Sequence, residues 1–234
     1  MLISAVNKMT LLDYPGKTAA IIFTAGCNFR CGYCHNAQFV LPEKIKDIKN
    51  DFIEFSAVKN FLSQRIGLID GVTFCGGEPT IHQDLEQCMK EVKDMGFLVK
   101  LDTNGTRPEI INSLIEKGIV DFIAMDIKYF EKNTKLLGDF YPEKKIKESI
   151  ALIQHAKNID YEFRSTILPK YHTPEVLDKM GQMIQGAKTW SLQNFRAIET
   201  LNTEFQKYQS FHEDDLEKLR IQLSKYADTI LIRT

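Results

Sequence analysis

Short apolar runs alternate with amphipathic stretches along most of the chain, which is the pattern of repeated βα units and a parallel sheet. The apolar runs predict strands at residues 18–24, 71–74, 97–102, 120–127, 161–168 and 193–198. The amphipathic segments predict helices at 56–66, 85–95, 108–117, 146–153 and 174–184, the first with Ser56 as its N-cap. Six consecutive βα units fit this order. The predicted fold class is therefore α/β, a partial TIM-like (β/α)6 barrel.

The C-terminal stretch adds one more helix and one more strand. Leu216, Leu219, Leu223 and Tyr226 recur at helical spacing, and residues 229–232 form a final apolar run. A chain of 234 residues suits one α/β barrel domain. We expect a single domain over residues 1–234, with a core at about 16–198 and a helix–strand extension at 199–234.

Composition changes this picture little. The chain has 30 basic and 31 acidic residues, so its net charge of -1 gives no reason to expect a nucleic acid or a membrane as partner. The N-terminus lacks the unbroken apolar core of a secretory signal, and no later stretch approaches the ~20 apolar residues of a membrane span. We expect a cytoplasmic protein.

Polar residues gather where the predicted strands end. In barrels of this kind functional side chains collect at the carboxyl ends of the strands. In this sequence those positions hold Glu78, Asp102, Asn104, Asp126 and Lys128, and the later strands hold Glu162, Arg164, Gln193 and Arg196. Taken alone, residues 102–105 would be an ordinary turn and residues 126–128 an ordinary strand end. Their common position at one rim favours a functional site.

The cysteines are the unusual feature of the composition. Three of the five, Cys27, Cys31 and Cys34, form a C-x3-C-x2-C cluster directly after the first predicted strand. Soft thiolates bind iron–sulfur clusters, zinc or copper. Structural zinc usually needs a second Cys/His pair, and none is evident here. Three thiolates on one loop instead suit a cubane with one open iron. Cys75 and Cys88 are expected to be core residues.

The cysteine motif, with Tyr33 as the aromatic residue of C-x3-C-x-aromatic-C, resembles the signature of the radical S-adenosylmethionine (SAM) superfamily. The segment VTFCGGEPT resembles the GGEP loop of the same superfamily. The resemblance implies that Cys27, Cys31 and Cys34 are catalytic and bind a 4Fe-4S cluster whose fourth iron binds SAM. It also implies contacts of Tyr33 with the adenine and of Gly76, Gly77 and Glu78 with the SAM amino group. Glycines allow such close backbone approach.

The resemblance extends over nearly the whole chain. The segments LLDYPGK, FTAGCNFRCGYCHN, the GGEP loop, LDTNG, MDIK, EFRSTILP and LQNFR look, in this order, like those of the anaerobic ribonucleoside-triphosphate reductase activating proteins. These are glycyl radical enzyme activases related to pyruvate formate-lyase activating enzyme. The family resemblance places Asp102 and Asn104 in the SAM pocket and makes Lys128 and Arg164 cations for the SAM carboxylate.

The same resemblance implies a monovalent cation at Asp102, Thr103 and Asp126. A cation between two carboxylates that face one rim is physically reasonable. One position departs from the family pattern, because the late-strand histidine of the lyase activase has no counterpart. The sixth strand here offers Gln193, Phe195 and Arg196.

The implied reaction begins when flavodoxin or ferredoxin supplies one electron. SAM is then cleaved to methionine and a 5'-deoxyadenosyl radical, which abstracts hydrogen from a glycine of the partner reductase. Two alternatives remain at this level. One is a small radical SAM enzyme that acts on a metabolite or nucleobase, related to carboxy-deazaguanine synthase. The other is a non-catalytic iron–sulfur or zinc-binding module. An activase predicts a broad groove near Cys31 and Arg164, whereas a metabolite enzyme predicts a closed lid built from residues 199–214.

Overall fold

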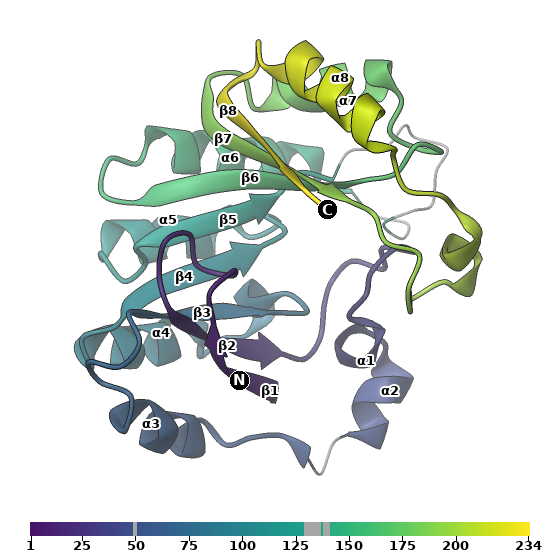
Figure 1. The fold of residues 1–234 in the computed structure, drawn as a ribbon. Helices are drawn as coiled ribbons and strands as arrows, with labels where there is room; N and C mark the ends of the chain where they lie inside the picture. The colour runs from purple at the N-terminus through teal and green to yellow at the C-terminus, as the bar shows by residue number, and fades with distance from the viewer. Residues whose placement is uncertain (49–50, 129–136, 138–140) are drawn as a thin grey trace.

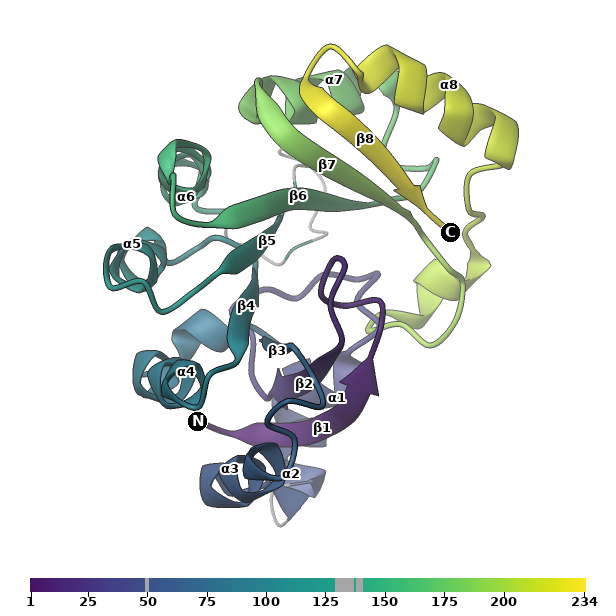
Figure 2. The same ribbon diagram turned by 60° about the vertical axis from the view of Figure 1, so that its left-hand side comes forward.

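The computed structural model of the chain describes residues 1–48, 51–128, 137 and 141–234. Eight strands form one sheet whose spatial order equals the chain order. The strands are β1 (Ile3–Thr10), β2 (Ala19–Thr24), β3 (Gly71–Gly76), β4 (Leu98–Thr103), β5 (Phe122–Asp126), β6 (Asp160–Ile167), β7 (Ala187–Asn194) and β8 (Ala227–Arg233). Only the β1–β2 pair is antiparallel. Because β1 and β8 end the order, the sheet is an open, partial barrel (Figure 2).

Helices lie outside the sheet and near the carboxyl ends of its strands. They are α1 (Ala37–Val40), α2 (Pro42–Asp47), α3 (Phe55–Ser63), α4 (Leu85–Asp94), α5 (Pro108–Glu116), α6 (Glu143–His155), α7 (Pro174–Met183) and α8 (Glu213–Leu223). Figure 1 shows α4, α5 and α6 on one side of the sheet and α1 and α2 near the carboxyl ends of the strands. In the described part of the chain, no helix is both long and apolar enough to cross a membrane.

Most of the core lies between the helices and the sheet. Leu101 of β4 and Met89 of α4 are fully buried in one large hydrophobic cluster. The alternate β4 positions Lys100 and Asp102 face the barrel interior, where Lys100 pairs with Asp102 and Asp102 pairs with Arg164 of β6. A second, smaller cluster surrounds the loop after β2. Its buried members are Phe29, Cys31, Tyr33, Leu137, Leu168, Phe195 and Phe205.

The strand and helix predictions are largely confirmed, but one strand and one N-cap were misplaced, and strand β1 and the short helices α1 and α2 were not predicted. The strand predicted at 193–198 lies at Ala187–Asn194 instead, because Trp190 and Leu192 are the buried side chains of the alternating pattern. Helix α3 begins at Phe55 with Glu54, not Ser56, at the N-cap. Strand β1 was not predicted, since its central residues are partly or fully exposed and give no apolar run.

Candidate functional site

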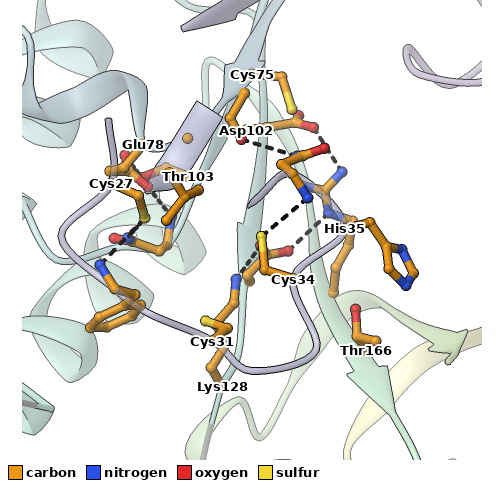
Figure 3. Close-up of a pocket in the computed structure, with 18 of the residues that line it drawn as sticks. Cys27, Cys31, Cys34, His35, Cys75, Glu78, Asp102, Thr103, Lys128 and Thr166 are labelled. Carbon is orange, nitrogen blue, oxygen red and sulfur yellow. Dashed lines mark hydrogen bonds and ion pairs between the residues drawn. The ribbon is translucent and has the colours of Figure 1, made fainter. Parts of the chain in front are cut away.

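A pocket of about 480 Å³ opens at the carboxyl ends of the strands. It collects every residue that the family resemblance assigns to the site, and Figure 3 shows many of these side chains around it. They are Cys27, Cys31, Tyr33, Cys34, Gly76, Gly77, Glu78, Asp102, Thr103, Asn104, Asp126, Lys128 and Arg164. The end of each of β2 to β6 contributes at least one residue, either on the strand or in the loop after it. The location agrees with the general position of sites in such barrels.

The cysteine loop, residues 25–36, is held by its own backbone. The Cys34 amide donates to the Cys31 carbonyl at 3.0 Å. The thiol sulfur of Cys27 accepts from the Phe29 amide, and that of Cys34 accepts from the Asn36 amide, both at 3.4 Å. These contacts leave the three thiols at the pocket wall, where Figure 3 shows Cys27 beside Glu78 and Cys31 beside Lys128.

Burial keeps these thiols protonated in the absence of a ligand. It raises the pKa of Cys27 to about 11 and that of Cys31 to about 12, and it also raises the pKa of Cys34. The positive charge of Lys128 opposes this rise and lowers the pKa values of all three thiols. A buried thiol beside a cation is a site where a positively charged metal group can displace the proton.

The donor set fits a cluster better than it fits one ion. Among the described residues, no three His, Cys, Asp or Glu side chains are close enough to hold a single metal ion. A cubane does not require the three side chains to converge on one point, because each thiolate binds a different iron. Cys27, Cys31 and Cys34, spread along one wall of the pocket, are compatible with such a group.

The GGEP loop is joined to the cysteine loop through backbone groups. The Gly77 amide donates to the Thr24 carbonyl and the Glu78 amide donates to the Gly26 carbonyl, each at 2.8 Å. Gly76 has φ +114°, and a Cβ at position 77 would lie 1.9 Å from the Gly26 carbonyl oxygen. Both glycines are therefore required by the local backbone.

Glu78 is 1% exposed and turns toward the end of β4. One carboxylate oxygen accepts from the Thr80 amide, the Thr80 hydroxyl and the Thr103 hydroxyl, and the other accepts from the Asn104 amide at 2.7 Å. Burial raises the pKa of Glu78, and these donors oppose the rise. The carboxylate thus fixes the β4 loop beside the pocket.

A chain of alternating charges lines the barrel interior below the cysteine loop. Lys100 contacts Asp102, whose second oxygen accepts from Arg164 at 2.8 Å. Arg164 also reaches Asp126 at 3.2 Å, and Asp126 pairs with Lys128 at 2.5 Å. Burial alone would raise the pKa values of both aspartates, but Arg164 holds that of Asp102, and Lys128 that of Asp126, below the ordinary range.

The guanidinium of Arg164 lies between the two carboxylates that were predicted to share a monovalent cation. Thr103, the third residue predicted for that site, donates its hydroxyl proton to Glu78. Arg164 therefore supplies positive charge to Asp102 and Asp126, and the bound cation stays a prediction.

Two asparagines that were not singled out hold the loops together. Asn28 donates to the Thr106 hydroxyl at 2.7 Å and accepts from the Asn104 side chain at 2.8 Å. Asn36 donates to the Gly76 carbonyl at 3.1 Å. Because Asn28 lies within the cysteine motif and Asn36 lies just after it, their position in the sequence could have indicated a role in holding the loop.

Of the remaining residues that the sequence indicated, some line the pocket and others do not. The expectation that Cys75 is a core residue was wrong, because it lines the pocket, whereas Cys88 is buried in the core as expected. Gln193 lines the pocket wall from the end of β7. Arg196 and Glu162 do not line it: Arg196 follows β7, and Glu162 pairs with Arg233 of β8.

Residues 199–214 give no wall of the pocket. They lie instead against the outer side of the cysteine loop, where the Leu201 amide donates to the Cys34 carbonyl at 2.8 Å. The described part of this segment is therefore not the lid over the pocket that a metabolite enzyme was expected to have.

Comparison with known proteins agrees with the motif and the fold. A family model for the radical SAM superfamily matches residues 21–183. The chain belongs to the radical SAM superfamily. This radical SAM enzyme is 33% identical over 242 residues to a Methanocaldococcus jannaschii protein named "Putative glycyl-radical enzyme activating enzyme". The match covers 100% of this chain and 96% of that protein. Membership of the superfamily implies a 4Fe-4S cluster and SAM as cofactors.

Other radical SAM proteins are similar over smaller shares. The pyruvate formate-lyase-activating enzyme of Staphylococcus epidermidis is 33% identical over 145 residues, which are 57% of this chain and 56% of that enzyme. The crystal structure of Streptococcus suis SuiB bound to precursor peptide SuiA matches with a TM-score of 0.68 at 14% identity. That match covers 92% of this chain and 48% of the SuiB chain, so it concerns the shared fold alone and about half the length of SuiB.

Substitution of Gly77 tests the junction between the two loops. We expect Gly77→Ala to cost about 3 kcal/mol in the free energy of unfolding, since the added methyl would overlap the backbone at Gly26. The measurement is urea unfolding of the apo protein. Gly67→Ala is the control, because a Cβ there meets nothing within 4 Å and costs only the strain of φ +77°, about 1 kcal/mol. Equal stability of the two variants would contradict the expectation.

Proposed function

We propose that this radical SAM enzyme is an activase that installs a glycyl radical on anaerobic ribonucleoside-triphosphate reductase. The observation that carries the proposal is the similarity over the full length of the chain to a protein named as a glycyl-radical enzyme activating enzyme. The pocket supports it, because three thiols of one loop face a charged barrel interior.

In this proposal Cys27, Cys31 and Cys34 hold the 4Fe-4S cluster and leave one iron for SAM. When bound, the cluster and SAM supply the radical that removes a hydrogen atom from the partner's glycine. Asn104 supports the loop by directing its amide nitrogen toward the Cys27 sulfur at 3.9 Å. The buried aromatic residues Phe29 and Tyr33 limit the access of water to the thiols.

The SAM pocket is proposed to use the backbone of Gly76 and Gly77, the loop fixed by Glu78, and the polar residues Asp102 and Asn104, with Tyr33 near the adenine. Lys128 and Arg164 are the proposed partners of the SAM carboxylate. Both already contact Asp126. A bound carboxylate would therefore share these two cations with Asp126. Before SAM binds, Asp126 balances the positive charge of Lys128 and Arg164.

The partner assignment is tested by electron paramagnetic resonance. The reductase is incubated anaerobically with this protein, SAM and a reductant, either flavodoxin or ferredoxin in reduced form. We expect the doublet of a glycyl radical on the reductase. Formation of 5'-deoxyadenosine without the doublet would point to a metabolite substrate and would contradict the assignment of the reductase as the partner. Absence of both products after cluster reconstitution would favour a non-catalytic module.

A further inference from the structure

A segment outside the pocket holds the cysteine loop from behind. Residues 199–210, called the strap below, lie in the connection between β7 and α8 (Figure 1) and contact the outer side of that loop. The Leu201 amide donates to the Cys34 carbonyl at 2.8 Å, and the Asn202 amide donates to the Gly32 carbonyl at 3.0 Å. Two backbone contacts thus join the strap to the stretch between Cys31 and Cys34.

Phe205 closes the same contact with its side chain. It is 3% exposed and lies in the short 3-10 turn Thr203–Lys207, which Asn202 caps by accepting from the Glu204 amide at 3.0 Å. A Cβ at Gly32 would lie 2.4 Å from the Phe205 ring. The ring therefore sits directly on the backbone of position 32, which accommodates it only because glycine has no side chain.

Aromatic residues surround the Phe205 ring. Its centroid lies 6.2 Å from that of Tyr33, 5.8 Å from that of Tyr171 and 5.1 Å from that of Tyr208. Together with Cys31 and Phe195, Phe205 belongs to the small hydrophobic cluster that is separate from the barrel core. The strap supplies the aromatic cover on the side of the cysteine loop that faces away from the strands.

The two ends of the strap differ in how they are held. At the N-terminal end Glu199 forms only an exposed ion pair, with Lys44 of α2 at 3.5 Å. At the other end Ser210 donates to the Phe195 carbonyl, and the next residue, Phe211, forms two hydrogen bonds with the Asn194 side chain at 2.9 and 3.0 Å. A segment fixed at its C-terminal end and bonded to the loop in the middle restricts the positions that the loop can take.

We propose that the strap is a clamp for the cysteine loop, with Phe205 on Gly32 as the positioning contact that keeps the three thiols ready for the cluster and shields the cluster from solvent. The inference rests on the proposed ligand role of Cys27, Cys31 and Cys34. It adds residues that the SAM pocket does not contain, since no strap residue lines that pocket.

The clamp is tested from both sides of the contact. Phe205→Ala removes the ring, and Gly32→Ala forces the ring away. In the apo protein we expect either change to speed hydrogen exchange across residues 27–36 and at the Leu201 and Asn202 amides about tenfold or more. After anaerobic reconstitution, both variants should hold less iron and sulfide than the wild type and lose their iron–sulfur absorbance several-fold faster in air.

Three further variants make the result specific. Phe205→Leu, which keeps an apolar side chain, should recover part of the protection. Gly32→Ala in the Phe205→Ala background should add little, because the ring that it would strike is gone, so the two effects should be non-additive. Phe61→Ala is the control, since Phe61 of α3 packs on the barrel core outside the strap and its anchors. It should leave exchange across residues 27–36 unchanged.

Wild-type exchange and wild-type cluster lifetime in both Phe205→Ala and Gly32→Ala would overturn the clamp. Additive effects of the two substitutions would overturn the direct contact as its basis. A wild-type protein that takes up no iron would instead overturn the ligand assignment, while exchange in the apo protein would still decide whether the strap holds the loop.

Discussion

Replacing Cys31 by alanine is expected to abolish cluster retention, lowering iron and sulfide after anaerobic reconstitution to the background of a protein without a site. Cys31 is the middle cysteine of the motif. It is buried, and it lines the wall of the pocket. A cubane that has lost one of three protein thiolates keeps too few ligands to stay bound. Iron and sulfide content and the iron–sulfur absorbance are the measurements.

Two other cysteines provide matched controls. Cys88→Ala removes a buried thiol from the barrel core and should lower stability while the cluster is retained. Cys75→Ala removes a thiol that lines the same pocket, and should also retain the cluster. Full iron content in Cys31→Ala, or loss of iron in Cys75→Ala, would show that the set of three ligands has been assigned incorrectly.

The second large effect is expected at Arg164. Arg164→Ala should lower the free energy of unfolding of the apo protein by about 3 kcal/mol, because it removes the cation shared by two buried carboxylates. The loss stays at the lower end of the range for a broken buried pair, since Lys100 and Lys128 still contact Asp102 and Asp126. Urea unfolding at pH 7 measures it, and calorimetry should show weakened SAM binding by the loaded enzyme.

Charge and geometry can be separated at this position. Arg164→Lys keeps the charge but cannot bridge two carboxylates, so an intermediate loss is expected. Asp126→Asn in the Arg164→Ala background should recover no stability, because it leaves the ammonium of Lys128 without the carboxylate that it pairs with. An Arg164→Ala protein as stable as the wild type would mean that the interior charges are well solvated and that the pairing contributes little.

The fold was predictable because its strands are buried runs. Strands such as β4 have continuous apolar or alternating patterns, and each is followed by a helix with a clear apolar stripe, as in α4. The exceptions have a common physical cause. Strand β1 is an edge strand with exposed residues, and β7 was displaced because the buried Phe195 continues the apolar pattern beyond the hydrogen-bonded ladder.

The site was predictable where its residues are contiguous in sequence. The cysteine motif and the GGEP loop each occupy a few contiguous residues, so their resemblance to the signatures of a known family located them. Pairings across the barrel were not accessible in this way. Nothing in the sequence indicates that Arg164 lies between Asp102 and Asp126, or that Glu78 is occupied by donors from the end of β4, because these contacts depend on the register of β3, β4, β5 and β6.

The division of the apolar residues into two clusters affects how the molecule opens. The large cluster joins the sheet to its helices, whereas the small one joins the cysteine loop, Leu168, Phe195 and Phe205. Groups of residues that share few contacts with the rest can unfold as separate cooperative units. We therefore expect the cysteine-loop cluster to open more readily than the barrel core. Loading of the proposed iron–sulfur cluster would then require local opening alone, on a scaffold that is already folded.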